Sequence, residues 1–240
     1  MGEFTAFDPT FDFRTEASGK RPDPDATSPT LRAYHKLLWS KPLPNGDSFE
    51  LTETTPRMSL RHRSKRGEFI LASDSAIPTF IRYRRMKDII SRIPESEEKE
   101  FDTITYQMGG MMLFPGNRIG GKPTINGARG LYRRISDRLD LTVECIRLHY
   151  LGETSPLAEP LDRYRDFFAL FEDFTGYIEF FLLQDLVSED RSAVKFFMPF
   201  DGFGMSPLPA SVEAYRNYRQ NAIRFVGARN RRMADYVAGR

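Results

Sequence analysis

The chain has 240 residues and a net charge of +2; 40% of its residues are hydrophobic and 28% are charged. This length and composition suit a folded domain with a sizeable core, and they exclude a disordered tail, a collagen-like fibre and a disulfide scaffold. No apolar run approaches the roughly 20 residues of a membrane helix. The N-terminus lacks the features of a secretory signal and Cys145 is the only cysteine, so we expect a cytoplasmic protein without membrane contact.

The first 27 residues are predicted to form an extended arm. They contain Phe4, Phe7, Phe11 and Phe13, which is more aromatic surface than a free tail usually carries. We therefore expect these rings to pack on the body, with residues 28–240 forming a single domain. Ser28 and Pro29 are typical of an N-cap and first helical position, so a helix should begin there and end before Pro42.

A small antiparallel β region should follow this helix. Residues 49–55, 58–61 and 68–72 are predicted strands, with Gly67 at a turn. Pro78 is expected to open a second helix over residues 79–93, and the acidic run 95–102 to form a loop. Further strands are predicted at 103–107 and 111–114.

Helices dominate the prediction for the second half. They are expected at 124–150, with a break near Gly127 and Gly130, and at 157–174, 177–187 and 211–237, with a strand at 193–198. The chain shows no internal repeat and no linker between two cores. The predicted fold class is therefore α+β: one compact domain with a small antiparallel β region in the first half and a mostly helical second half.

Basic residues concentrate in two segments. Residues 57–87 contain nine basic and two acidic side chains, and residues 212–240 contain seven arginines and two acidic side chains. Such clusters can attract a polyanion such as RNA. They are equally typical of ordinary solvated faces that are balanced by acidic residues elsewhere.

The most informative element is the predicted helix 135–150. Asp137, Asp140, Glu144 and Arg147 form one charged stripe between two apolar stripes. Clustered carboxylates of this kind could bind a divalent metal such as Mg²⁺ or act as general acid and base, with Arg147 holding an anionic group. The same spacing would also suit a structural ladder of ion pairs.

Two further groups of residues could contact a substrate. Asn126 and Arg129 are three residues apart, so they would share a helix face on which Arg129 could clamp a phosphate or carboxylate. His35, Trp39 and Lys41 could supply an acid–base group, a stacking ring and a phosphate contact. The alternatives are a helix cap with a surface arginine, and a core tryptophan beside an uninvolved histidine.

Several long phrases resemble an uncharacterised bacterial family, a domain of unknown function. They include SPTLRAYHKLLWSKPLPNG (28–46), INGARG (125–130) and DRLDLTVECIRLHY (137–150), and the resemblance extends from about Phe7 to Arg232. It implies a bacterial, intracellular protein of one domain. It implies no activity and no site.

Three functions follow as hypotheses. The first is RNA binding through the basic segments, with metal-assisted phosphodiester or nucleotide chemistry at Asp137, Asp140 and Glu144. The second is an enzyme acting on a small metabolite, with a pocket lined by the helix 137–147. The third is an interaction protein without catalysis, in which that helix carries a structural ion-pair network.

Overall fold

The computed structural model describes residues 6–16, 23–54 and 59–240. Within these residues the chain forms a compact α+β domain with small antiparallel sheets in the first half and a mostly helical second half, as predicted. Four residues of the predicted arm, strands and basic segment lie outside the described residues: Phe4, Thr55, Arg57 and Met58. What was predicted at these positions stays a prediction.

Two antiparallel sheets form in the described chain. One pairs β1 with β2, and the other has the order β3-β4-β5-β6. The strands are β1 (Lys41–Pro42), β2 (Ser48–Phe49), β3 (Thr52–Glu53), β4 (Leu60–Ser64), β5 (Gly67–Ser75) and β6 (Met111–Pro115). Gly67 has a φ of 138°, which only glycine adopts readily, and this explains the turn between β4 and β5.

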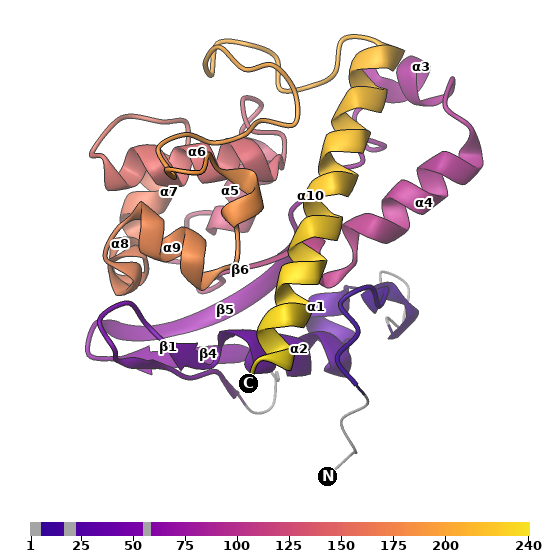
Figure 1. Ribbon diagram of the computed structural model, residues 1–240. Coiled ribbons are helices and arrows are strands. Elements are labelled where there is room, and N and C mark those ends of the chain that lie inside the picture. Colours follow the sequence, from indigo (N-terminus) through magenta and orange to yellow (C-terminus); the bar gives the residue numbers. More distant parts are fainter. Residues whose placement is uncertain (1–5, 17–22, 55–58) are drawn as a thin grey trace.

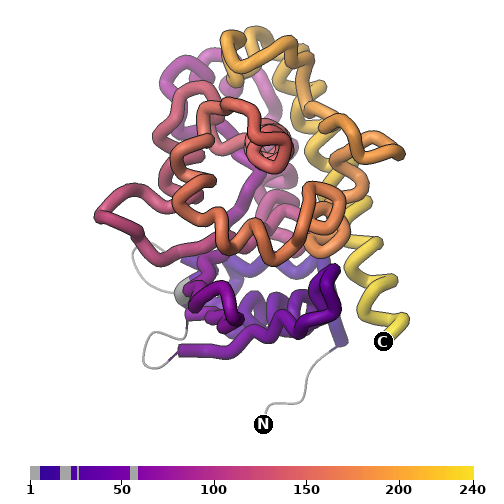
Figure 2. Tube along the Cα trace, turned by 90° about the vertical axis from the view of Figure 1, so that its left-hand side faces the viewer, coloured from indigo at the N-terminus to yellow at the C-terminus, as the bar shows by residue number. Residues whose placement is uncertain are grey.

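The helices surround these sheets. They are α1 (Pro24–Thr27), α2 (Pro29–Trp39), α3 (Lys87–Ile90), α4 (Glu95–Thr105), α5 (Ile125–Leu131), α6 (Leu139–Tyr150), α7 (Ala158–Arg163), α8 (Arg165–Phe168), α9 (Phe174–Phe180) and α10 (Val212–Ala238), with 3-10 turns at η1 (Phe13–Glu16), η2 (Arg84–Met86), η3 (Met108–Gly110), η4 (Ala169–Phe171) and η5 (Gln184–Leu186). In Figure 1, α5 to α9 gather on one side of the long strand β5, and α1 and α2 lie on the other. Figure 2 shows the same separation from the side.

The N-terminal segment packs on the body where it is described. The Phe13 ring is fully buried, and Phe7 and Phe11 pack against the core. Phe7 and Phe13 both contact the ring of Tyr34 in α2. The hydroxyl of Ser28 accepts a hydrogen bond from the Leu31 N–H, so α2 begins with the cap that the sequence indicated.

Three predictions between residues 79 and 107 are wrong. Residues 79–93 contain only η2 and the short α3, because Tyr215 and Tyr218 of α10 donate hydrogen bonds to the Thr79 and Pro78 carbonyls and hold this segment in an irregular course. The acidic run and residues 103–105 form α4 instead of a loop and a strand. Acidic side chains in the first turn of a helix interact favourably with its dipole, which is the signal that was missed.

Other boundaries also differ in the second half. The predicted helix 124–150 is two helices, α5 and α6, separated by residues 132–138. Residues 157–174 are broken into α7, α8 and η4. The predicted strand 193–198 is reduced to one bridge between Val187 and Val194. In contrast, α10 covers the predicted helix 211–237 almost residue for residue.

The long helix α10 joins the two halves of the fold. The fully buried Arg229 donates hydrogen bonds to the carbonyl oxygens of Gly109, Met111 and Phe181. The Asn230 side chain accepts a hydrogen bond from the Gly109 N–H. These contacts fix η3 and the start of β6, the strand beside β5, against α10.

Candidate functional site

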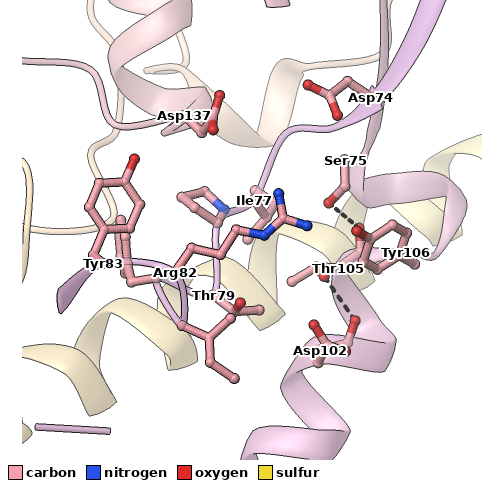
Figure 3. Close-up of a pocket in the computed structure, with 13 residues that line it drawn as sticks. Asp74, Ser75, Ile77, Thr79, Arg82, Tyr83, Asp102, Thr105, Tyr106 and Asp137 are labelled. Carbon is pink, nitrogen blue, oxygen red and sulfur yellow. Dashed lines mark hydrogen bonds between the residues drawn. The ribbon is translucent and has the colours of Figure 1, made fainter. Parts of the chain in front are cut away.

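The candidate site is a polar cleft at the end of β5. Two cavities of about 190 and 780 Å³ adjoin there, and both are lined by Asp74, Ser75, Arg82 and Tyr106. The smaller cavity also contacts Tyr83 and Asp137, and the larger contacts Asp23 and Asp25. Figure 3 shows Asp74 and Asp137 at one side of the smaller cavity and the Arg82 guanidinium between them and Asp102.

The strand alternation of β5 places Asp74 in the cleft. Phe69, Leu71 and Ser73 point to the buried face, so Asp74 points to the opposite face. Asp74 lies opposite Met112 in the fully buried strand β6, which fixes its register. The aspartate is therefore held on a rigid strand rather than on a loop.

Asp137 reaches the same cleft from the connection between α5 and α6. Ser136 and Asp137 have φ values of 49° and 62°, a left-handed conformation that non-glycine residues rarely adopt. Strained residues of this kind persist where the surrounding structure fixes them, and they are enriched at functional sites. Gly130 leaves room for the carboxylate, since a Cβ there would lie 3.2 Å from the Asp137 Oδ2.

Arg129 connects the two aspartates. Its side chain is fully buried, and one of its amino groups lies 3.4 Å from the Asp74 carboxylate. The other donates a 2.6 Å hydrogen bond to the Asp137 carbonyl oxygen, and Nε donates to the Thr142 hydroxyl. The Asp137 N–H in turn donates to the Arg129 carbonyl oxygen. Arg129 thus positions both residues from behind the cleft.

The cleft carries more negative than positive charge, and this affects protonation. Burial raises the pKa of Asp74 to about 6, with Arg129 opposing the shift and Asp137 and Asp23 adding to it. The Asp74 side chain is nevertheless 41% exposed, because it borders the cavity. Protein surrounds the cavity itself, which is why burial still raises the pKa of this carboxyl group. Burial raises the pKa of Asp25 to about 7, and Asp23 and Asp74 add to this shift. Both carboxyl groups can therefore exchange protons near neutral pH.

Aromatic and cationic groups complete the lining. Burial raises the pKa of the Tyr83 and Tyr106 hydroxyls, so both are neutral hydrogen-bond donors near neutral pH. The Arg82 guanidinium lies in the cleft, and within the described chain no carboxylate forms an ion pair with it. It is the cationic group of the cleft that is exposed to a ligand, because Arg129 is buried behind Asp74.

The four residues of the predicted charged stripe do not lie together in the structure. Only Asp137, which precedes the helix, reaches the cleft. Asp140 is fully buried, where its carboxylate pairs with Arg138 and accepts a 2.8 Å hydrogen bond from the Phe197 N–H. Glu144 forms two 2.8 Å hydrogen bonds with Arg147 on the same helix. Of the ion-pair ladder that the spacing also allowed, only the Glu144–Arg147 step is present, because Asp140 pairs with Arg138 instead.

The other candidate residues lie outside the cleft or behind it. His35 is fully buried, and its Nε2 lies 2.8 Å from the Ser73 hydroxyl. Trp39 donates a hydrogen bond to Nδ1 of His35, so Nε2 carries the proton and donates to Ser73. Burial lowers the pKa of His35 to about 3, which keeps the ring neutral. Asn126 lies 3.5 Å from Arg129, and Lys41 packs among aromatic rings on another face.

Four arginines of the two basic segments form ion pairs. Arg61 and Arg63 form ion pairs with Glu68 across the β4–β5 hairpin. In α10, Arg219 pairs with Glu97, and Arg232 pairs with Asp185. Among the described residues, no group of three or more His, Cys, Asp or Glu side chains is arranged to hold a metal ion.

The site residues predicted from the sequence did not include five that line the cleft: Asp25, Asp74, Arg82, Tyr83 and Tyr106. One signal existed for Asp74, which is a charged residue that follows Ile70 and Ala72 on the less buried face of β5. Nothing in the local sequence connects Asp25 with it. They meet because the Ser73 N–H donates a 2.7 Å hydrogen bond to the Asp25 carboxylate, which joins α1 to β5.

Comparisons with known proteins add a family but no activity. No helix of the described residues combines the length and apolar character needed to cross a membrane. Neither the curated proteins nor the solved structures contain a match to the chain. The family model of DUF6994, a family of unknown function, matches residues 7–233. Because this match spans nearly the whole sequence, the protein belongs to the family of unknown function DUF6994.

Proposed function

We propose that the protein is an enzyme that acts on a small molecule by general acid–base catalysis in the cleft of Asp74 and Asp137. One observation carries the proposal: Arg129, buried and fully hydrogen-bonded, holds an aspartate from β5 and a strained aspartate from the α5–α6 connection at one cavity. Two carboxyl groups in different environments are a common acid–base arrangement.

Asp74 is assigned the proton transfer. Its raised pKa of about 6 leaves both protonation states accessible near neutral pH, so one group can give and regain a proton within a cycle. Asp137 is assigned the stabilisation of positive charge that develops on the substrate. The hydroxyls of Tyr83 and Tyr106, as neutral hydrogen-bond donors, would orient the substrate.

The substrate class follows from the charge of the cleft. Asp23, Asp25, Asp74, Asp102 and Asp137 line it, together with the exposed Arg82. Asp102 forms an ion pair with Arg14 and Asp74 with Arg129, and the carboxylates still outnumber these three arginines. A phosphate in the inner part would meet several carboxylates, and like charges repel strongly in a partly desolvated site. The substrate group that enters is therefore neutral or cationic, such as a hydroxyl or an amine.

A thermal-shift screen tests the proposal. The probes are small amines, polyols and sugars, with phosphorylated compounds as a comparison set, and compounds that stabilise the protein are incubated with it and analysed by mass spectrometry for turnover. Amines or polyols should stabilise the wild type, and Asp74→Asn should abolish both the shift and turnover. Asp88→Asn, at an exposed position in α3 outside the cleft, is the matched control. Ligand shifts that survive in Asp74→Asn, or that occur with phosphates alone, would refute the assignment.

RNA binding is the second candidate, at a different surface. Lys65 and Arg66 are exposed at the tip of the β4–β5 hairpin, beside a cavity of about 440 Å³ that they line together with Arg63. Asp140 and Glu144 already hold arginines, so this candidate assigns them no metal. Binding to labelled RNA should weaken linearly with the logarithm of salt concentration, and it should be lost in a Lys65→Ala, Arg66→Ala variant. Absence of binding at 50 mM salt contradicts it.

A further inference from the structure

The smaller cavity of the cleft holds a cation and an anion that do not pair with each other. Its charged lining consists of four side chains: Asp74, Arg82, Asp102 and Asp137. Asp74 pairs with Arg129, and Asp102 pairs with Arg14. Among the residues that the structure describes, neither the Arg82 guanidinium nor the Asp137 carboxylate forms an ion pair, although Figure 3 shows both at this cavity.

The backbone holds these two charges in place on separate segments. Phe80 is buried and has a φ of 60°, and the Tyr83 N–H donates a 2.9 Å hydrogen bond to its carbonyl oxygen, which closes the turn that carries Arg82. Asp137 is held by its two backbone hydrogen bonds with Arg129. The cavity therefore presents one positive and one negative group from fixed backbone positions.

A ligand with both charges would satisfy both groups. A guanidinium can donate two parallel hydrogen bonds to a carboxylate, and an ammonium group can donate to an aspartate. Such a ligand has no net charge, so it avoids the repulsion that the aspartates of the cleft exert on a phosphate. The cavity of about 190 Å³ is also smaller than the roughly 300–1,000 Å³ of pockets for drug-sized ligands, which favours a small molecule.

We propose that the cleft binds an amino acid, with its ammonium group at Asp137 and its carboxylate on Arg82. This inference rests on the proposed function, because it names the substrate class of the same site. Arg82 is then the residue that determines specificity, since it selects amino acids over simple amines and polyols. A substituent on the amino acid would extend into the adjoining cavity of about 780 Å³, where Asp23 and Asp25 can accept hydrogen bonds from it.

Isothermal titration calorimetry with probes of matched chain length tests the proposal. In one such set, γ-aminobutyrate carries both charges, butylamine only the ammonium and butyrate only the carboxylate. Glycine, β-alanine and δ-aminovalerate, each with its own amine and carboxylate, vary the separation of the charges. The best-fitting amino acid should bind at least about tenfold more tightly than its amine or its carboxylate. Equal affinity for the amino acid and its amine, or no binding of any amino acid in the series, would overturn the proposal.

Charge variants of Arg82 isolate its role. In Arg82→Gln the affinity for the amino acid should fall to that for its amine, while the affinity for the amine does not fall. Arg82→Glu should reverse the preference, so that the diamine putrescine binds more tightly than γ-aminobutyrate. Arg85→Gln, at an exposed position that lines neither cavity, is the matched control and should keep the wild-type preference. Thermal unfolding without ligand shows whether each variant is folded.

The two proposals fail in different ways. If amines bind and Asp74→Asn abolishes this binding, but amino acids bind no more tightly than amines, the proposed function stands and the amino-acid site is refuted. If amino acids bind through Arg82 but none is converted to a product, the amino-acid site is supported and acid–base catalysis is refuted. A preference for amino acids that persists in Arg82→Gln overturns the role of Arg82.

Discussion

Replacing Asp25 by asparagine should stabilise the protein, and only at high pH. The Asp25 carboxyl accepts a hydrogen bond from the Ser73 N–H, which an asparagine carbonyl oxygen can also accept. The substitution therefore keeps this contact between α1 and β5 and removes a charge that the cleft disfavours.

The magnitude follows from the pKa. Burial raises the pKa of Asp25 from 3.8 to about 7, a change of about three units at about 1.4 kcal/mol each. The upper limit is therefore about 4 kcal/mol. Asp25 borders an open cavity and shares the shift with its acidic neighbours, so about 1–2 kcal/mol is the expected gain.

The sign depends on pH. Below about pH 4 both folded and unfolded chains hold the proton, and the ionisation penalty is absent. Between about 4 and 7 the folded protein keeps a proton that the unfolded chain has lost, so wild-type stability falls as pH rises. Above about 7 the penalty is complete. The advantage of Asp25→Asn should be near zero at pH 4 and reach its full size at pH 8.

Urea unfolding at these two pH values checks the prediction. The fluorescence of Trp39 reports unfolding, since it is the single tryptophan and is fully buried. Asp88→Asn, an exposed control, should show no pH-dependent gain. An Asp25→Asn protein that is less stable than wild type at pH 8, or equally stabilised at both pH values, would refute the electrostatic account of the cleft.

Three further substitutions test the framework around the site. Asp140→Asn leaves the buried Arg138 with a neutral partner and should lower the free energy of unfolding by about 3 kcal/mol, while catalytic turnover per folded molecule is unchanged. Arg129→Met should destabilise by a similar amount and also abolish ligand binding in the cleft, as measured by thermal shift, because it releases Asp74 and Asp137. Gly109→Ala should destabilise by about 2–4 kcal/mol in urea melts, because its Cβ would overlap the Val226 carbonyl oxygen.

The sequence was informative where local chemistry dominates. The Ser28 cap, the strand at 68–72 and the period of α10 follow from interactions within a few residues, and all three were predicted. Spacing also revealed the charged stripe from Asp140 to Arg147, and it allowed both a functional cleft and an ion-pair ladder. Its two readings could not be separated, because spacing alone does not reveal whether a charged helix face meets solvent, a cleft or another buried charge.

Tertiary contacts decided the rest. Residues 78–83 are irregular because the hydroxyls of Tyr215 and Tyr218, more than 130 positions later, donate hydrogen bonds to the carbonyl oxygens of Thr79 and Pro78. The cleft likewise needs α1, β5 and the α5–α6 connection to meet, and the pKa values of Asp25 and Asp74 arise only after that meeting removes them from bulk water. By itself the sequence determined the fold class, the Ser28 cap and the strands at 68–72 and 111–114, since these depend on neighbours along the chain. Which aspartates share a cavity was settled by long-range packing, because proximity in space between distant segments leaves no periodic trace in the chain.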